Sequence, residues 1–433
     1  MISLFNKQEN NLDTGEKFFL FGIFFLPFAL PIGGLFLLIS LVISYFKNYK
    51  KILKDKWNYP LFISVGIILI STINSSIINT PIELIKYEKS IIWINLFNWI
   101  PIIFGFCGFQ HYLVSNNQKI RFSKFLLLGS IPVIISCILQ FNLKIYGPFR
   151  ILNGLIVWFQ YPLEENGYGV TGLFNNQNYT ACFFSIILPF ALFALRITKS
   201  NFKKYSLIIF NLLIVYFMFL TLSRNALLCL FVISFTFIGI RRLLLIFSSI
   251  SIITLGLGFL GFVNNFLFSF INQINLTTFY SKLLELNTTP RTQIWNSAIS
   301  FIQKRPILGW GASTFSHLFS FHNEKIKPPL KLLNSQHSHN LFLEIAHNFG
   351  LPLALIIFIT LTILIFKVIN KIKLNFNSSD LFINETWLIS SLLVLIYQTT
   401  DITYYDGKIS LIICILFAGL RTILPVNNLR KET

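Results

Sequence analysis

Long apolar stretches are the feature that most limits what this chain can fold into. Residues Tyr205–Leu222, Leu243–Val263 and Leu351–Val368 each have or approach the roughly 20 residues that an α-helix needs to cross the hydrocarbon of a bilayer. Charged residues make up only 12% of the 433-residue chain, well below the roughly 25% that is usual in soluble domains. The sequence therefore predicts an all-α, polytopic integral membrane protein.

The apolar stretches predict about twelve membrane-spanning helices. Their expected positions are 18–30, 32–46, 61–75, 91–114, 124–141, 178–197, 205–222, 225–240, 243–263, 351–368, 385–400 and 409–424. The first two share one stretch, Phe18–Phe46, which is interrupted by Pro27 and Pro31. These residues permit either two short spans or one kinked helix. Basic residues on both flanks favour the pair.

Basic residues outnumber acidic residues by 35 to 16, which gives a net charge of +19. In a soluble protein such an excess would suggest a nucleic-acid partner. Here more than half of the Lys and Arg residues fall in the short segments that alternating spans place on the same side as the two termini. Because cytoplasmic loops collect Lys and Arg, the sequence predicts that both termini are cytoplasmic and that nucleic acid is not a partner.

This topology divides the chain into four parts, with two long loops on the outer side. The parts are an N-terminal transmembrane region at 1–177 with an outer loop at 142–177, central transmembrane helices at 178–263, an outer loop at 264–350, and C-terminal transmembrane helices at 351–433. Loops of this length are uncommon unless they carry a function. Within the larger loop, apolar residues at helical spacing predict short helices at Thr289–Ile302 and Gln336–Asn348.

Four short polar motifs lie on the outer side of this topology, and the first two adjoin spans. The segment from Gly172 to Asn178 contains amides that can bond sugar hydroxyls or phosphate oxygens, but Asn176 or Asn178 can also simply cap the next helix. Arg224 lies in a minimal turn between two spans. Its guanidinium can pair with a phosphate, or it can be an arginine that extends to the membrane interface.

The other two motifs lie in the larger loop. Arg291 falls in the first turn of a predicted helix, where the helix dipole disfavours a cation, so it is either a functional residue or a solvated surface arginine. Trp295 and Trp310 suit interfacial anchors, and their indole faces could also stack on sugar rings. His337 and His339 are two positions apart, so on a helix their rings would face different ways. Without a carboxylate cluster they favour proton transfer over metal binding, and a capping role stays open.

Several chemical motifs are missing from the sequence. It contains no Asp-x-Asp pair of the kind that holds Mg²⁺ on a nucleotide sugar, no Gly-x-x-x-x-Gly-Lys-Ser/Thr phosphate loop and no Gly-x-Ser-x-Gly elbow. Its five cysteines lie in or beside apolar stretches without a CxxC pair, which argues against a disulfide framework and against a metal site. We therefore expect any chemistry to start from an activated substrate already in the membrane, without a metal or another cofactor.

Taken in order, the motifs resemble those of the O-antigen ligase and polymerase family of membrane glycosyltransferases. The resemblance covers roughly Gly172–Pro352 and rests on TGLFNNQN, LTLSRNA, RTQIW…PILGWG and HSHNLFLE…GLP. It implies a twelve-span enzyme of the bacterial inner (plasma) membrane that acts in lipopolysaccharide biosynthesis. Such an enzyme takes a glycan from a polyprenyl diphosphate carrier, such as undecaprenyl diphosphate, on the periplasmic face. It passes the glycan to a hydroxyl acceptor, typically on the lipid A core, with inversion and without a metal.

The resemblance also implies roles for particular residues. By position, Arg224 and Arg291 correspond to the family's essential arginines, and His339 corresponds to its essential histidine, with His337 as the alternative. The residues predicted to contact the lipid-linked donor, or the lipid or glycolipid acceptor, are Asn175, Asn178, His337 and Trp310. A polymerase of the same family, a related enzyme that glycosylates proteins, and a secondary transporter remain alternatives.

Overall fold

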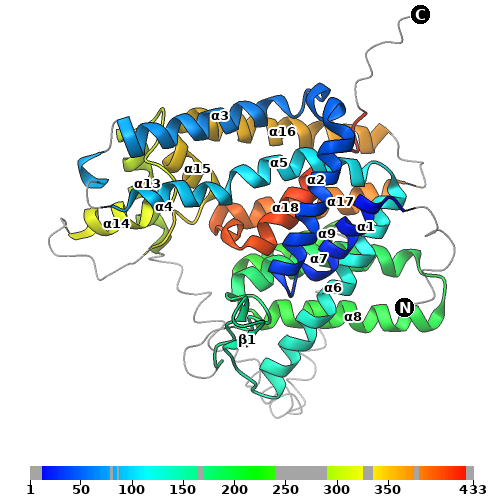
Figure 1. Cartoon of the computed structure of the whole chain (residues 1–433). Helices are drawn as coiled ribbons and strands as arrows, with labels where there is room; N and C mark the ends of the chain where they lie inside the picture. The colour runs from blue at the N-terminus through cyan, green and yellow to red at the C-terminus, as the bar shows by residue number, and fades with distance from the viewer. Residues whose placement is uncertain are drawn as a thin grey trace, which may run out of the picture.

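The computed structural model is mostly helical (Figure 1). It describes residues 12–78, 81–84, 87–163, 169–238, 290–324, 335–374 and 380–425. Most of the long helices run along one common direction, so they form a bundle with two distinct ends. This arrangement agrees with the predicted helical membrane protein.

Eight helices in the described part of the chain are long and apolar enough to cross a bilayer. They are α2 (Leu30–Lys54), α3 (Tyr59–Ile73) with the π-helical turn that follows it to Ile78, the run of α4 (Lys89–Ile94) and α5 (Ile100–Phe109) that continues to Leu113, α6 (Asn116–Asn142), α7 (Gln177–Ile197), α8 (Asn201–Leu220), α16 (Leu351–Leu374) and α17 (Leu381–Thr400). Shorter helices that coincide with predicted spans are α1 (Thr14–Phe25), α9 (Arg224–Ile238) and α18 (Gly407–Arg421). The span predicted at 243–263 lies outside the described residues, so the total of twelve is not confirmed.

The apolar stretch Phe18–Phe46 forms two helices rather than one kinked helix. Pro31 lies in the first turn of α2, where the missing N–H of proline costs no helical hydrogen bond. The two helices approach closely, because a Cβ atom on Gly33 would lie 2.6 Å from the backbone nitrogen of Leu26. The pair that the flanking charges favour is therefore present, although α1 is shorter than a full span.

Ion pairs gather at the end of the bundle that the charge pattern assigns to the cytoplasm. Arg421 donates two hydrogen bonds to Asp55, Nε to Oδ2 at 2.9 Å and Nη2 to Oδ1 at 3.0 Å. Arg121 Nε donates to Glu16 Oε1 at 2.9 Å. These pairs join the ends of α18 and α2 and the starts of α6 and α1, as alternating antiparallel spans require. Which compartment this end faces stays a prediction.

The centre of the bundle is built on α7 and α17. In the most apolar part of α7, 72% of the residues are buried inside the protein, against 22% in α2 and in α16. The exposed surfaces of α2 and α16 are therefore available for contact with lipid. The Trp387 side chain of α17 is fully buried, with ring centroids 4.8 Å from Phe122 and 5.5 Å from Phe190. This packing fixes the ends of α7 and α17, which carry polar residues discussed below.

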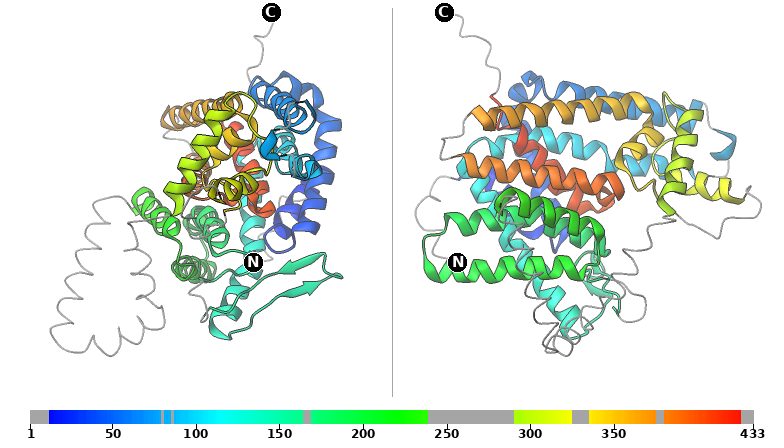
Figure 2. Two further views of the ribbon diagram at one scale, coloured as in Figure 1. Left: turned by 90° about the vertical axis from the view of Figure 1, so that its left-hand side faces the viewer. Right: turned by 180° about the vertical axis from the view of Figure 1, so that it is seen from behind.

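The segment predicted as the larger outer loop contributes short helices at the opposite end of the bundle from the ion pairs (Figure 2). α13 (Pro290–Lys304) confirms the helix predicted at Thr289–Ile302, and α14 (Phe315–Glu324) follows it. Together with the turn Ile82–Leu84 they enclose a second core around Phe301 and Phe315. α15 (Leu341–Phe349) begins later than the helix predicted at Gln336–Asn348.

A two-stranded hairpin between α6 and α7 was not predicted from the sequence. β1 (Phe149–Ile151) pairs antiparallel with β2 (Ile156–Trp158). The hairpin emerges at the same end of the bundle as the start of α7.

Candidate active site

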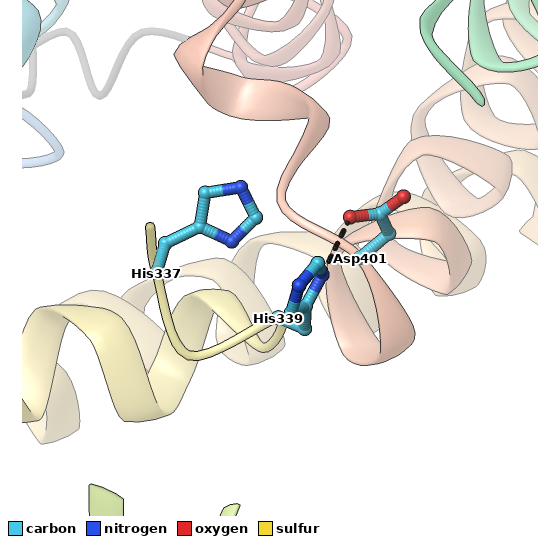
Figure 3. Close-up of side chains that lie close together, drawn as sticks. All are labelled: His337, His339 and Asp401. Carbon is cyan, nitrogen blue, oxygen red and sulfur yellow. Dashed lines mark hydrogen bonds and ion pairs between the residues drawn. The ribbon is translucent and has the colours of Figure 1, made fainter. Parts of the chain in front are cut away.

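Polar side chains from segments far apart in sequence meet at the end of the bundle opposite the ion pairs. The central group consists of His337 and His339, from the turn before α15, and Asp401, from the residue after α17 (Figure 3). The histidine ring centroids are 4.4 Å apart. His339 Nδ1 lies 3.1 Å from Asp401 Oδ1.

The turn before α15 holds His339 in an unusual backbone conformation. Its φ is +54°, in the left-handed region that non-glycine residues rarely adopt. The turn is fixed because Asn340 caps α15 by accepting the Leu343 N–H at 3.0 Å, and because Asn340 Nδ2 donates to the Thr399 carbonyl at 2.9 Å. The cap therefore keeps His339 out of the helix and beside the end of α17. Backbone conformations of this kind concentrate at functional sites.

Asp401 was not identified from the sequence, and it is the best-connected residue of the group. Oδ1 accepts hydrogen bonds from His339 and from the Ile402 N–H at 2.9 Å, and Oδ2 accepts from Asn178 Nδ2 at 2.8 Å. Burial raises the pKa of this carboxyl, but the hydrogen bond from His339, the charge that His339 has when protonated and the charge of Arg291 lower it more, so its pKa lies below the usual value. The ionised carboxylate can only accept, so His339 Nδ1 carries a proton and Nε2 is left as a base.

Of the two predicted arginines, Arg291 lies within electrostatic reach of Asp401, and Arg224 lies within reach of Arg291. Arg291 is the second residue of α13, and burial lowers the pKa of its guanidinium; the charge of Asp401 opposes that change and the like charge of Arg224 adds to it. Arg224 is exposed at the first position of α9. Its neighbour Asn225 accepts a hydrogen bond from Thr400 Oγ1 at 2.9 Å, which ties the start of α9 to the end of α17. The fold thus brings Arg291 toward Asp401 and Arg224 toward Arg291.

His337 is more enclosed than His339. Its ring stacks on Tyr405 with centroids 5.7 Å apart, and its buried Nδ1 has no hydrogen-bond partner among the residues that the structure describes. Burial lowers the pKa of His337 to about 4, and the charge of His339 acts in the same direction. His337 is therefore neutral at physiological pH.

A buried carboxylate, Glu344, supports the histidine turn from beneath. Its Oε2 accepts the Ser338 N–H at 2.9 Å and its Oε1 accepts the Tyr405 hydroxyl at 2.7 Å. Burial raises the pKa of Glu344. Glu344 belongs to the sequence motif, but no role was predicted for it from the sequence. Glu344 therefore fixes both the backbone at Ser338, between the two histidines, and the Tyr405 ring, which stacks on His337.

The geometry of the histidine pair differs from the one on which the expected absence of a metal ion was based. The sequence predicted His337 and His339 on one helix with no carboxylate nearby, whereas they lie in a turn and Asp401 supplies a carboxylate. The ligand atoms of these three residues lie within 4.8 Å of one another, so they could hold a cation. However, Asp401 already accepts three N–H donors, and Arg291 and Arg224 bring positive charge to the same region. The arrangement favours proton transfer and anion binding over a resident cation.

The remaining predicted site residues have mixed outcomes. Asn178 reaches the site, but its side chain supports Asp401, while Asn176 caps α7 as the alternative interpretation proposed. Asn175 is exposed, and its Oδ1 accepts the Phe159 N–H at 3.3 Å. Trp310 is only 3% exposed, and its indole N–H donates to the Phe301 carbonyl at 2.8 Å. The ring of Trp310 lies inside the second core, which favours a packing role over the predicted interfacial or sugar-stacking role.

Fold and site together define a multi-pass membrane protein with a histidine–carboxylate pair and two arginines at one end of its bundle. The family model described as O-antigen ligase matches residues 209–358, from α8 into α16. The match covers about a third of the chain and agrees with the resemblance to this family that the motifs indicate. Arg224, Arg291 and His339 lie inside the matched region, and Asp401 lies outside it. No curated protein matches the chain.

Proposed function

We propose that this protein transfers a glycan from a polyprenyl diphosphate carrier to a hydroxyl group of a lipid-borne acceptor, as an O-antigen ligase. The transfer takes place at the membrane surface where His339 and Asp401 lie. The observation that carries the proposal is the 3.1 Å contact between His339 Nδ1 and Asp401 Oδ1 close to Arg291. A base and an anion-binding group side by side meet the two chemical requirements of this reaction.

The base is Nε2 of His339. Because Nδ1–H is bonded to Asp401, the ring is held in the tautomer that leaves Nε2 able to accept a proton. The side chain of His339 is 28% exposed, so an acceptor hydroxyl can reach it. General-base catalysis of this kind contributes about 10²–10⁴ in rate.

The leaving group is a diphosphate, which gains negative charge as its bond to the sugar breaks. Arg224 and Arg291 stabilise that charge more in the transition state than in the ground state. The acceptor oxygen forms a bond to the anomeric carbon as the bond to the diphosphate oxygen breaks. The hydroxyl proton passes to His339 and the electron pair leaves with the diphosphate. Attack from the face opposite the leaving group inverts the anomeric centre.

The acceptor distinguishes the ligase from the runner-up, a polymerase of the same family. A ligase uses a hydroxyl of the lipid A core, whereas a polymerase uses a second carrier-linked glycan. A secondary transporter is less favoured because the candidate residues gather at one end of the bundle, whereas transporter sites lie near the midplane.

The test is transfer by the purified full-length protein in proteoliposomes, with a defined polyprenyl diphosphate glycan as donor and either lipid A core or a second donor molecule as acceptor. We expect glycan on the lipid A core and release of polyprenyl diphosphate. Elongated carrier-linked glycan would make the protein a polymerase. Full activity of the His339→Ala variant would overturn the proposed mechanism.

A further inference from the structure

The hairpin between α6 and α7 has a surface that its place in the fold does not explain. The strands pair with Phe149 opposite Trp158 and Ile151 opposite Ile156. The connecting turn contains Leu152 and Asn153, both with φ of +53°. Such a two-stranded unit is only marginally stable in water without support from a third strand or a packed helix.

Large apolar side chains cover the hairpin and its flanks, although no described part of the protein packs over them. Leu152 and Leu155, on either side of the tip, are 57% and 63% exposed. Phe149, Ile151 and Phe159 are further exposed apolar side chains of this segment. Within the strands the charged residue is Arg150, which is also exposed. Several exposed apolar side chains on one short hairpin indicate a binding partner.

Hydrogen bonds fix the depth of the hairpin at the ends of the spans. Trp158 Nε1 donates to the Phe28 carbonyl, between α1 and α2, at 2.9 Å, and Gln140 Nε2, near the end of α6, donates to the Tyr161 carbonyl at 3.2 Å. In the segment that follows the hairpin, the Val170 N–H donates a hydrogen bond to the carbonyl of Leu220, the last residue of α8, at 2.9 Å. The base of the hairpin therefore lies level with the ends of several membrane helices.

The hairpin extends sideways from the bundle. In the left view of Figure 2, which looks at the bundle from the end that carries the active site, the strands project beyond the helices. Because the spans run along the viewing direction, the hairpin is oriented parallel to the membrane plane.

Of water, the hydrocarbon core and the headgroup–acyl boundary of a bilayer, one environment suits both the apolar side chains and the backbone edges of the hairpin. Full exposure to water would leave its apolar tip unburied. The hydrocarbon core is excluded because the outer edges of β1 and β2 would have backbone groups without partners there. The headgroup–acyl boundary accepts apolar side chains while water and headgroups still pair with the backbone edges.

We propose that the β1–β2 hairpin is a membrane-interface anchor that lies in the leaflet on the active-site side. Leu152 and Leu155 insert among the upper acyl chains, and Arg150 contacts lipid phosphates. The partner is the lipid bilayer itself, and the surface continues the lipid-facing surface of the neighbouring spans. This inference does not depend on the proposed transfer reaction.

Nitroxide labels on the full-length protein in proteoliposomes of phosphatidylethanolamine and phosphatidylglycerol test the proposal. The labels go on single cysteines introduced as Leu155→Cys and, independently, Leu152→Cys; the native cysteines are all buried. The matched controls are Phe366→Cys, on the exposed apolar face of α16, and Gln303→Cys, exposed on α13. Collision of each label with oxygen, which is enriched in lipid, is compared with its collision with a water-soluble nickel complex.

We expect both hairpin labels to collide more with oxygen than with nickel, as the Phe366→Cys label does. A nickel-accessible pattern like that of Gln303→Cys would place the hairpin in water and overturn the proposal. Spin–spin broadening that grows with the protein-to-lipid ratio would show instead that the hairpin pairs with a second copy of the chain, which would also overturn it.

Discussion

Asp401 accepts a hydrogen bond from His339 across 62 residues of sequence, at 3.1 Å, and the same carboxylate accepts another from Asn178. The contact joins the C-terminal end of one central span to the turn before a short helix of the outer segment. Asn178 adds the start of the other central span. Two deeply packed helices of the bundle, α7 and α17, therefore determine the position of the His339 ring.

Replacement of Asp401 by asparagine should lower the turnover number of glycan transfer by about 10²–10⁴, because the ring of His339 loses the partner that sets its tautomer. The apparent KM for the donor should change much less, since Asp401 does not contact substrate in the proposed mechanism. Asp13→Asn, which removes an exposed ion pair with Lys47 at the other end of the bundle, is the matched control. Steady-state transfer kinetics of both variants decide the matter, and equal turnover in the two would contradict the role of Asp401.

Substitution at Arg224 should show that shape matters as well as charge. Arg224→Lys should be nearly as damaging as Arg224→Ala, with losses on the order of 10² or more, because an ammonium cannot form the two parallel hydrogen bonds of a guanidinium to a phosphate. The control is Arg196→Lys, at the opposite end of the bundle over the Phe382 ring. Transfer rates with saturating donor are the measurement. If Arg224→Lys kept most of the activity, bidentate phosphate binding would be excluded.

Removal of divalent cations should leave transfer intact. The carboxylate of Asp401 accepts hydrogen bonds from N–H donors, and the positive charge of Arg291 acts on the same carboxylate. We therefore expect equal rates with and without excess EDTA. Loss of activity that one added cation restores would show instead that His337, His339 and Asp401 hold a metal.

The sequence was sufficient to predict the elements and residues that carry local signals. Arg224, Arg291 and His339 belong to short motifs, and the helix at Thr289–Ile302 has its own apolar periodicity and an initial proline. The Asn340 cap also precedes an apolar run and could have been used to start α15 later. That boundary decided the geometry of the histidine pair, because the same two residues lie apart on a helix and close together in a turn.

What could not be predicted depends on tertiary contacts. Asp401 appears in the sequence only as an acid at the end of a span, with no sign of its distant partner. Trp310 lies between two glycines, and nothing in this local sequence indicates that it is buried. It is buried because Leu84, more than two hundred residues earlier, belongs to the same core. Such contacts arise only when spans from both halves of the chain have been packed.

Trp310 provides a test of that second core. Trp310→Ala should destabilise the protein by about 3–5 kcal/mol, since it removes a large buried side chain and leaves a cavity. Trp310→Phe should lose less, because it keeps most of the apolar volume, and its KM for donor and acceptor should equal that of the wild type. Thermal unfolding in detergent gives the first quantity and transfer kinetics the second. A large rise in KM for Trp310→Phe without loss of stability would restore Trp310 to a substrate-binding role.

His337 should make stability depend on pH in a defined window. Burial lowers its pKa from 6.5 to about 4, so between these values the unfolded chain binds a proton that the folded protein does not bind. The contribution of His337 to stability should therefore rise with pH from about 4 to 6.5, by up to about 3 kcal/mol. His347, which is buried with a pKa lowered to about 3, contributes in the same direction, whereas Glu344, whose pKa burial raises, contributes in the opposite direction. His337→Gln should consequently show a less positive slope than the wild type. The measurement is the free energy of unfolding at several pH values in this window, and parallel curves for the two proteins would show that His337 takes up its proton equally well in the folded state.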